Sequence, residues 1–256
     1  MKSPDLLWNK ILKLSLAVPG VRIDRKNFLR KELAPYCTRE KLELAIRTSP
    51  AVAGIPAPVL DKIARKSIAS HINMVTLMSF ATGLPGGWWL AAAIPGDIIQ
   101  YYYHVIVIVQ KLVYLHGWPE LTGKDGDLDK KTAGMLTLFI GAMMGSVKAG
   151  EALHSISIKL ALRSMARLPE AELSKYALFN IAAQVAEWIG LKITKKNFAK
   201  HAVKIIPVAG GVVAGGLTYW SFRAMTAKLN RYLARLPLAL PPAGLPEKME
   251  MRKAEC

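Results

Sequence analysis

Residues 67–110 have the sequence SIASHINMVTLMSFATGLPGGWWLAAAIPGDIIQYYYHVIVIVQ, and this stretch decides the fold. Its one formally charged side chain is Asp97, and the glycine- and proline-containing groups GLPGG and IPGD interrupt it. A membrane-spanning helix needs about 20 uninterrupted apolar residues, which neither half supplies. We predict a helical hairpin, in which one helix ends near residue 82 and a second runs from about residue 95 to about residue 115. Such a hairpin forms either the core of an all-helical domain or a wedge that enters a bilayer.

The composition and charge of the chain restrict its class. Of 256 residues, 52% are hydrophobic and 21% are charged, and the formal net charge is +17. A chain of this kind either lies next to lipid or builds a large helical core, and its charge favours anionic partners such as nucleic acid or the inner leaflet of a membrane. Cys37 and Cys256 are its two cysteines, so we expect no disulfide framework and a reducing, cytosolic compartment.

The pattern along the chain predicts an all-α fold, a single domain of roughly eight to ten helices built around the hairpin. We divide it into a basic N-terminal helical region at 1–54, a helical domain at 55–236 and a disordered tail, rich in proline and charge, at 237–256. Within the domain, Gly190 is expected to end a helix, Thr194 to cap a basic one, and residues 208–216 to turn into the last helix.

Two blocks of sequence occur in a recognisable order. The first, at 81–118, joins ATGLPGG, IPGD and YYYHVIVIVQKLVYLHGW, and the second, at 194–222, reads TKKNFAKHAVKIIPVAGGVVAGGLTYWSF. Together they resemble the EcsC protein family over most of residues 55–233, although Thr218 and Tyr219 stand where the family has an asparagine. The resemblance implies a helical, membrane-associated protein. Bacterial members of the family are often encoded beside ABC transporter genes tied to secretion, and the resemblance supplies no catalytic residues.

Polar side chains in the hairpin are the first site candidates. Asp97, Tyr101 and His104 have the spacing that places them on one face of a helix. A carboxylate in apolar surroundings must be paired, hydrogen-bonded or protonated. Asp97 either accepts backbone N–H bonds in the first helical turn or forms a buried polar site that includes His71 on the opposing arm.

Glu151 and His154 form one Glu-x-x-His pair. Carboxylate-bridged metal sites in helix bundles use two such pairs and two further carboxylates, so we expect no metal and no other cofactor. A metal-dependent helical enzyme that uses Asp97 and His104 together with this pair remains the alternative. The sequence has no phosphate-binding loop, nucleophile elbow or H-E-x-x-H motif.

Aromatic and basic residues indicate contact with lipid. Trp88 and Trp89 at the hairpin turn suit the membrane–water interface, although they would also suit a cap over the core. A lysine recurs every four residues at Lys192, Lys196, Lys200 and Lys204. A basic amphipathic helix of this kind is typical of proteins that bind anionic headgroups, at about 1 kcal/mol per lysine, and a solvated basic face is the other interpretation.

Two glycine pairs have the spacing that lets helices approach closely. These are Gly141 with Gly145 and Gly211 with Gly215. The spacing is found in membrane helix pairs and equally in tight crossings of soluble helices.

The sequence therefore predicts a membrane-associated, non-enzymatic accessory protein on the cytoplasmic face of the inner membrane, attached peripherally or as a monotopic protein. Its expected partners are anionic lipid, a membrane protein such as a transporter, and a second copy of the chain. A metal-dependent enzyme and a membrane-perturbing or pore-forming effector are the alternatives. Nucleic acid is the weakest partner, because the aromatic residues lie in apolar segments away from the basic helices.

Overall fold

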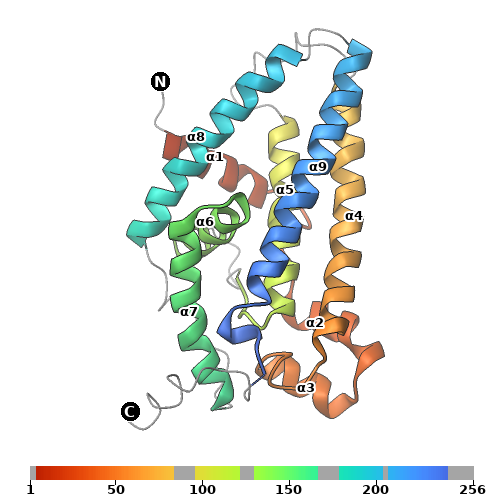
Figure 1. The fold of residues 1–256 in the computed structure, drawn as a ribbon, viewed down its shortest axis with the longest axis vertical. Coiled ribbons are helices and arrows are strands. Elements are labelled where there is room, and N and C mark those ends of the chain that lie inside the picture. The colour runs from red at the N-terminus through yellow and green to blue at the C-terminus, as the bar shows by residue number, and fades with distance from the viewer. Residues whose placement is uncertain (1–3, 84–95, 122–129, 167–178, 204–206, 242–256) are drawn as a thin grey trace.

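The protein is built from helices, as its computed structural model shows (Figure 1). The structure describes residues 4–83, 96–121, 130–166, 179–203 and 207–241. These residues contain α-helices and no strand, which confirms the all-α prediction. In chain order the helices are α1 (Pro4–Leu16), α2 (Arg25–Leu33), α3 (Arg39–Arg47), α4 (Ala57–Gly83), α5 (Gly96–Leu115), α6 (Lys130–Met144), α7 (Val147–Met165), α8 (Phe179–Val203) and α9 (Pro207–Leu233). Two short 3-10 turns are η1 (Ala34–Tyr36) and η4 (Pro237–Ala239).

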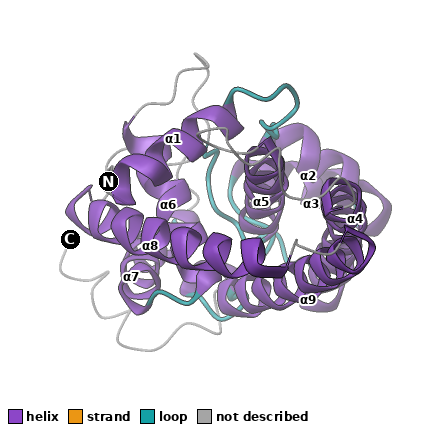
Figure 2. Cartoon of the chain, turned by 90° about the horizontal axis from the view of Figure 1, so that it is seen from above, coloured by secondary structure: helices purple, strands orange, loops and turns teal. Residues whose placement is uncertain are grey.

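Three long helices, α4, α5 and α9, lie side by side (Figures 1 and 2). Helix α4 is antiparallel to both of the others, and it packs along α9 over a longer contact than along α5. The predicted helices of the hairpin are therefore present and in contact. They share their packing with α9, so the organising unit is a group of three helices. The residues that connect α4 to α5 lie outside the described part.

On the other side of α5 lie α1, α6, α7 and α8 (Figure 2). Helix α8 packs against α1 and α6 and continues without a break past Gly190 and Thr194, so the predicted helix end and cap are wrong. The glycine serves a different purpose, because a Cβ at Gly190 would overlap the backbone of Pro4 in α1. A missing side chain here lets two helices touch.

The N-terminal region at 1–54 belongs to the same hydrophobic core as the rest of the protein. Trp8 of α1 is fully buried, its ring packs edge-on against Tyr102 at 5.2 Å, and its indole N–H donates to the hydroxyl of Thr137 at 2.9 Å. The interface between this region and 55–236 is thus a packed core.

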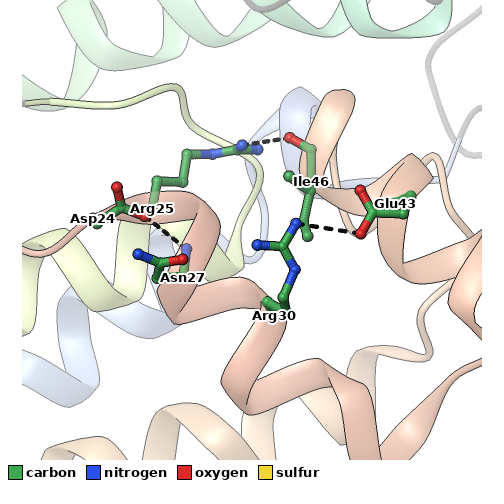
Figure 3. Close-up of polar contacts among 6 residues, drawn as sticks. All are labelled: Asp24, Arg25, Asn27, Arg30, Glu43 and Ile46. Carbon is green, nitrogen blue, oxygen red and sulfur yellow. Dashed lines mark hydrogen bonds and ion pairs between the residues drawn. The ribbon is translucent and has the colours of Figure 1, made fainter.

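Figure 3 shows how the start of α2 is capped and how α2 is joined to α3. Asp24 caps the helix by accepting the backbone N–H of Asn27 at 2.6 Å. The neighbouring Arg25 is 1% exposed. Its guanidinium donates to the carbonyl oxygens of Trp118 at 2.8 Å, Ile46 at 2.6 Å and Thr48 at 3.2 Å. An arginine is always charged, so partners such as these carbonyls are needed for it to be buried.

Two predictions for the C-terminal third need correction. Residues 208–216 do not form a turn, because α9 is helical from Pro207, which occupies the first helical position where proline is favoured. The predicted disordered tail does not begin at residue 237, because η4 is ordered and Leu238, 2% exposed, packs with it against α7. Residues 242–256 lie outside the described part.

Candidate functional site

A row of three nitrogen-bearing side chains crosses the contact between α4 and α5. His71 of α4 and His104 of α5 face each other with their Nδ1 atoms 3.1 Å apart. Lys111 of α5 places its Nζ 3.1 Å from Nε2 of His71. His71 is 6% exposed and His104 is 1% exposed, whereas Lys111 is half-buried. We call these three residues the Lys–His–His row, and it leads from the protein surface into the core.

The surroundings of the row keep its histidines uncharged. The pKa of His71 falls from 6.5 to about 3, first because burial disfavours the imidazolium and then because Lys111 and His104 lie close by. Burial, followed by Lys111, also lowers the pKa of His104. Burial lowers the pKa of Lys111 as well, and the carboxylate of Glu32 opposes this effect. At neutral pH each imidazole can therefore donate one hydrogen bond and accept one.

The structure brings together two of the four predicted buried polar residues, His71 and His104. Tyr101 lies against α9 instead, where its hydroxyl contacts Sδ of Met225 at 3.8 Å and its ring packs edge-on against Phe222. Burial raises the pKa of Tyr101 to about 12, so it remains a phenol at neutral pH. Asp97 lies in the first turn of α5, and its side chain is outside the described part.

Glu151 and His154 are exposed on α7 and line an open groove of about 580 Å³ together with Lys228 and Tyr232 of α9. His104 belongs to the buried row between α4 and α5, a different place from this groove. In the described residues no group of three histidine, cysteine, aspartate or glutamate side chains is arranged to hold a metal ion. The metal-enzyme alternative therefore lacks a ligand set in this part of the chain.

The predicted lipid-contact residues are only partly described. Trp88, Trp89 and Lys204 lie outside the described residues. Lys192 is exposed on α8, with its Nζ 4.2 Å from the centre of the Trp188 ring. Lys196 and Lys200 lie on the same helix at a spacing that returns to the same face, although their side chains are not described.

The glycine pairs differ from each other in the structure. Gly141 lies inside α6, and a Cβ there would overlap Val185 of α8, as expected for a close helix crossing. Gly145 is not on a helix face, because it follows the end of α6 with a φ of +99°. The N–H of Ser146 donates to the carbonyl of Gly141 at 2.8 Å, the bond of a glycine-terminated helix end. Gly211 and Gly215 lie in α9, and their surroundings are not described.

Sequence reasoning missed a second polar network, which fixes the register of α4 against α9. His116 and Asn230 share a hydrogen bond of 2.9 Å, and the Asn230 amide donates to Asp61 at 3.2 Å. Met74 lies thirteen residues after Asp61, and Leu217 lies thirteen residues before Asn230. Both are therefore about 20 Å along their antiparallel helices from this contact, at the same level.

Exposed apolar side chains lie near that level on both helices, and sequence reasoning missed these too. Met74 and Leu77 of α4 are 48% and 69% exposed, and Leu217 and Trp220 of α9 are 51% and 68% exposed. We call these four residues the apolar patch. One described helix segment, Ile98–Leu115, is long and apolar enough to cross a membrane, but 67% of it is buried within the protein. A core helix would pass the same test.

No protein-family model, curated protein or solved structure matches this chain. The resemblance to the EcsC family therefore stays a prediction from the sequence.

Proposed function

We propose that this protein is a membrane-associated, non-enzymatic accessory protein that contacts one leaflet, on the cytoplasmic face of the inner membrane. The observation that carries the proposal is a segregation of charge. Residues 67–83 of α4, 98–110 of α5 and 207–222 of α9 contain no aspartate, glutamate, lysine or arginine. These three segments lie at the same end of the protein, the upper end in Figure 1, and we call them the uncharged end.

The uncharged end is more than a buried core, because the apolar patch lies on its surface. Leu77 and Trp220 each expose more than two thirds of their area to solvent. Residues 67–83 rise about 24 Å along α4, whereas the hydrocarbon of one leaflet is about 15 Å thick. The outer turns of α4 and α9 can thus enter a leaflet without carrying a formal charge into it, whereas α5 carries Asp97 in its first turn.

Groups suited to the headgroup layer lie where the uncharged end stops. On α9, the guanidinium of Arg223 donates to the hydroxyl of Tyr219 at 3.0 Å, next to the exposed Trp220. Tryptophan, tyrosine and arginine are the side chains that anchor proteins at the membrane–water interface. Helix α8, which bears Lys192, Lys196 and Lys200, runs toward the same end of the protein (Figure 1). Anionic headgroups would attract these lysines.

The remaining parts of the proposal rest on the sequence. The absence of a catalytic motif supports a non-enzymatic role, and the resemblance to the EcsC family makes a membrane transport or secretion protein the partner that we propose. The uncharged end is where such a partner and the lipid would both be met.

Vesicle flotation tests the proposal. The full chain is mixed with vesicles of phosphatidylcholine alone or of phosphatidylcholine with phosphatidylglycerol, at low and at high salt. We expect stronger binding to the anionic vesicles and a partial release by salt, because the lysine contribution is screened and the apolar contact is not. A protein that stays in the soluble fraction with both kinds of vesicle would overturn the proposal.

A further inference from the structure

The hydrogen bonds of the Lys–His–His row can run in only one direction. An ammonium group only donates, so Nε2 of His71 must accept from Lys111. His71 then carries its hydrogen on Nδ1 and donates it to Nδ1 of His104. His104 must carry its own hydrogen on Nε2, a buried atom that has no hydrogen-bond partner among the described residues. The row therefore ends inside the protein in an unsatisfied donor.

This arrangement leaves no place for another proton. A proton added to Nε2 of His71 would face the Lys111 ammonium, and a proton added to Nδ1 of His104 would face the N–H of His71. Either one breaks a hydrogen bond and adds a buried positive charge. The low pKa of His71, about 3, agrees with this geometry.

The groups around the row do not compensate for such a charge. From α2, the Glu32 carboxylate acts on Lys111 and also lies 3.9 Å from Lys66 of α4, while Lys31 adds positive charge. The ring of Tyr103 packs edge-on against His104 at 4.9 Å. Residues 207–222 of α9, which pack along α4, carry no formal charge.

We infer that the Lys–His–His row is an acid-sensitive latch, which holds α4 against α5 until His71 or His104 takes up a proton. Separation of the two helices would expose their inner apolar faces to lipid. This consequence rests on the proposed membrane role, whereas the latch itself can be tested without lipid. The open state has a further advantage, because water then satisfies the buried N–H of His104.

Linkage gives the size of the effect. In the open state His71 regains an ordinary pKa near 6.5, so it multiplies the ratio of open to closed protein by about fourfold at about pH 6 and about thirtyfold at about pH 5. His104, whose pKa burial also lowers, acts in the same direction. An anionic leaflet at about −30 mV concentrates protons at its surface by about threefold. The surface that the protein is proposed to bind therefore favours opening.

Nitrogen-15 NMR of the histidine rings tests the latch in the absence of lipid. At about pH 7.5 we expect the Nδ1–H form for His71 and the Nε2–H form for His104. Both should resist protonation until the pH lies well below about 6.5, the ordinary pKa of a histidine. Other tautomers, or titration of His71 and His104 near about pH 6.5 while α4 and α5 remain in contact, would overturn the inference.

Binding to vesicles of phosphatidylcholine alone tests the consequence, because these vesicles do not attract the extra charge that a protein gains in acid. Between about pH 7.5 and about pH 5 we expect a rise in binding of at least about tenfold for the wild type. The control variant His154→Gln, which also lacks one histidine, should behave in the same way. The double variant His71→Gln/His104→Gln retains donors and acceptors but cannot titrate, and its binding should stay constant.

Each result decides one proposal. An equal rise in the double variant, or no rise in a wild type that binds anionic vesicles at about pH 7.5, removes the latch and leaves the proposed function standing. Failure to bind any vesicle removes the proposed function, and the NMR tautomers then decide the latch alone. If the double variant lacks native helical content by circular dichroism, His71→Leu/His104→Leu takes its place, since replacing both partners by apolar groups leaves neither histidine unpaired.

Discussion

Replacing Leu77 by glutamate should weaken binding to anionic vesicles by about thirtyfold. Full burial of a leucine side chain contributes about 1.5–3 kcal/mol, and Leu77 is 69% exposed, so lipid contact at this side chain is worth about 1–2 kcal/mol. The negative charge adds about 1 kcal/mol of repulsion from the anionic surface. The sum, about 2 kcal/mol at its lower end, corresponds to a factor of about thirty in the partition constant.

The matched control is Val147→Glu on α7. Val147 is 73% exposed, so this variant also replaces an exposed apolar residue by the same charge, at a position away from the uncharged end. Neither substitution should change the stability of the fold by more than about 0.5 kcal/mol, because both side chains face solvent. Partition constants from vesicle titration are the measurement. Equal weakening by both variants, or no weakening by Leu77→Glu, would refute the reasoning.

Three further predictions concern the fold and its dependence on pH. Arg25→Met should lower the free energy of unfolding, measured with urea, by about 3 kcal/mol, because buried carbonyls lose their donor. Arg30→Met should lower it by less than about 1 kcal/mol, because Arg30 and Glu43 form an exposed pair (Figure 3), and equal losses would contradict the account. Gly141→Ala should lower the free energy of unfolding by about 1–3 kcal/mol, because the added Cβ would overlap Val185, whereas Gly216→Ala, with open space around it, should raise it by up to about 1 kcal/mol. The reverse order of stabilities in thermal unfolding would be inconsistent with the packing described. The pKa of His71 lies near 3 in the folded protein and near 6.5 in the unfolded chain, so the stability that it contributes is complete above about pH 6.5, falls by about 2 kcal/mol by about pH 5, and continues to fall toward about pH 3. Urea denaturation at several pH values measures this dependence, and a free energy of unfolding that does not change with pH would count against it.

Local sequence signals mark some of the helix ends in this protein. Asp24 and Thr38 cap their helices through side-chain hydrogen bonds to the backbone, as such residues do before an apolar pattern. Pro35 follows α2 directly, in the 3-10 turn η1. These signals depend on a few neighbouring residues, so they can be interpreted without the tertiary structure.

Glycine was harder to interpret, because its role depends on a distant partner. Gly190 resembles a helix end in the sequence, yet it lies inside α8. The backbone of Pro4 in α1 occupies the space that a side chain at this position would need. Gly145 resembles a close-packing residue, yet it ends α6 with a positive φ. The same residue type serves both purposes, and only the packing of the helices distinguishes them.

The candidate site, too, could be predicted only in part from the sequence. The sequence placed His71 and His104 on the two arms of the hairpin, and the structure brings them into contact. Lys111 was missed although it lies seven residues after His104, a spacing that returns to the same helix face. The apolar patch could not be predicted, because an apolar sequence does not tell which of its side chains the fold leaves exposed.

The most direct test of the membrane proposal is the depth of single residues in a bilayer. An environment-sensitive fluorophore would be attached to Leu77→Cys or to Val147→Cys, in a chain whose Cys37 and Cys256 are replaced by serine, with vesicles that contain phosphatidylglycerol and lipid-borne quenchers. The account predicts a blue-shifted emission and strong quenching at position 77 and neither change at position 147. Equal, water-like emission at both positions while the protein is bound would contradict it.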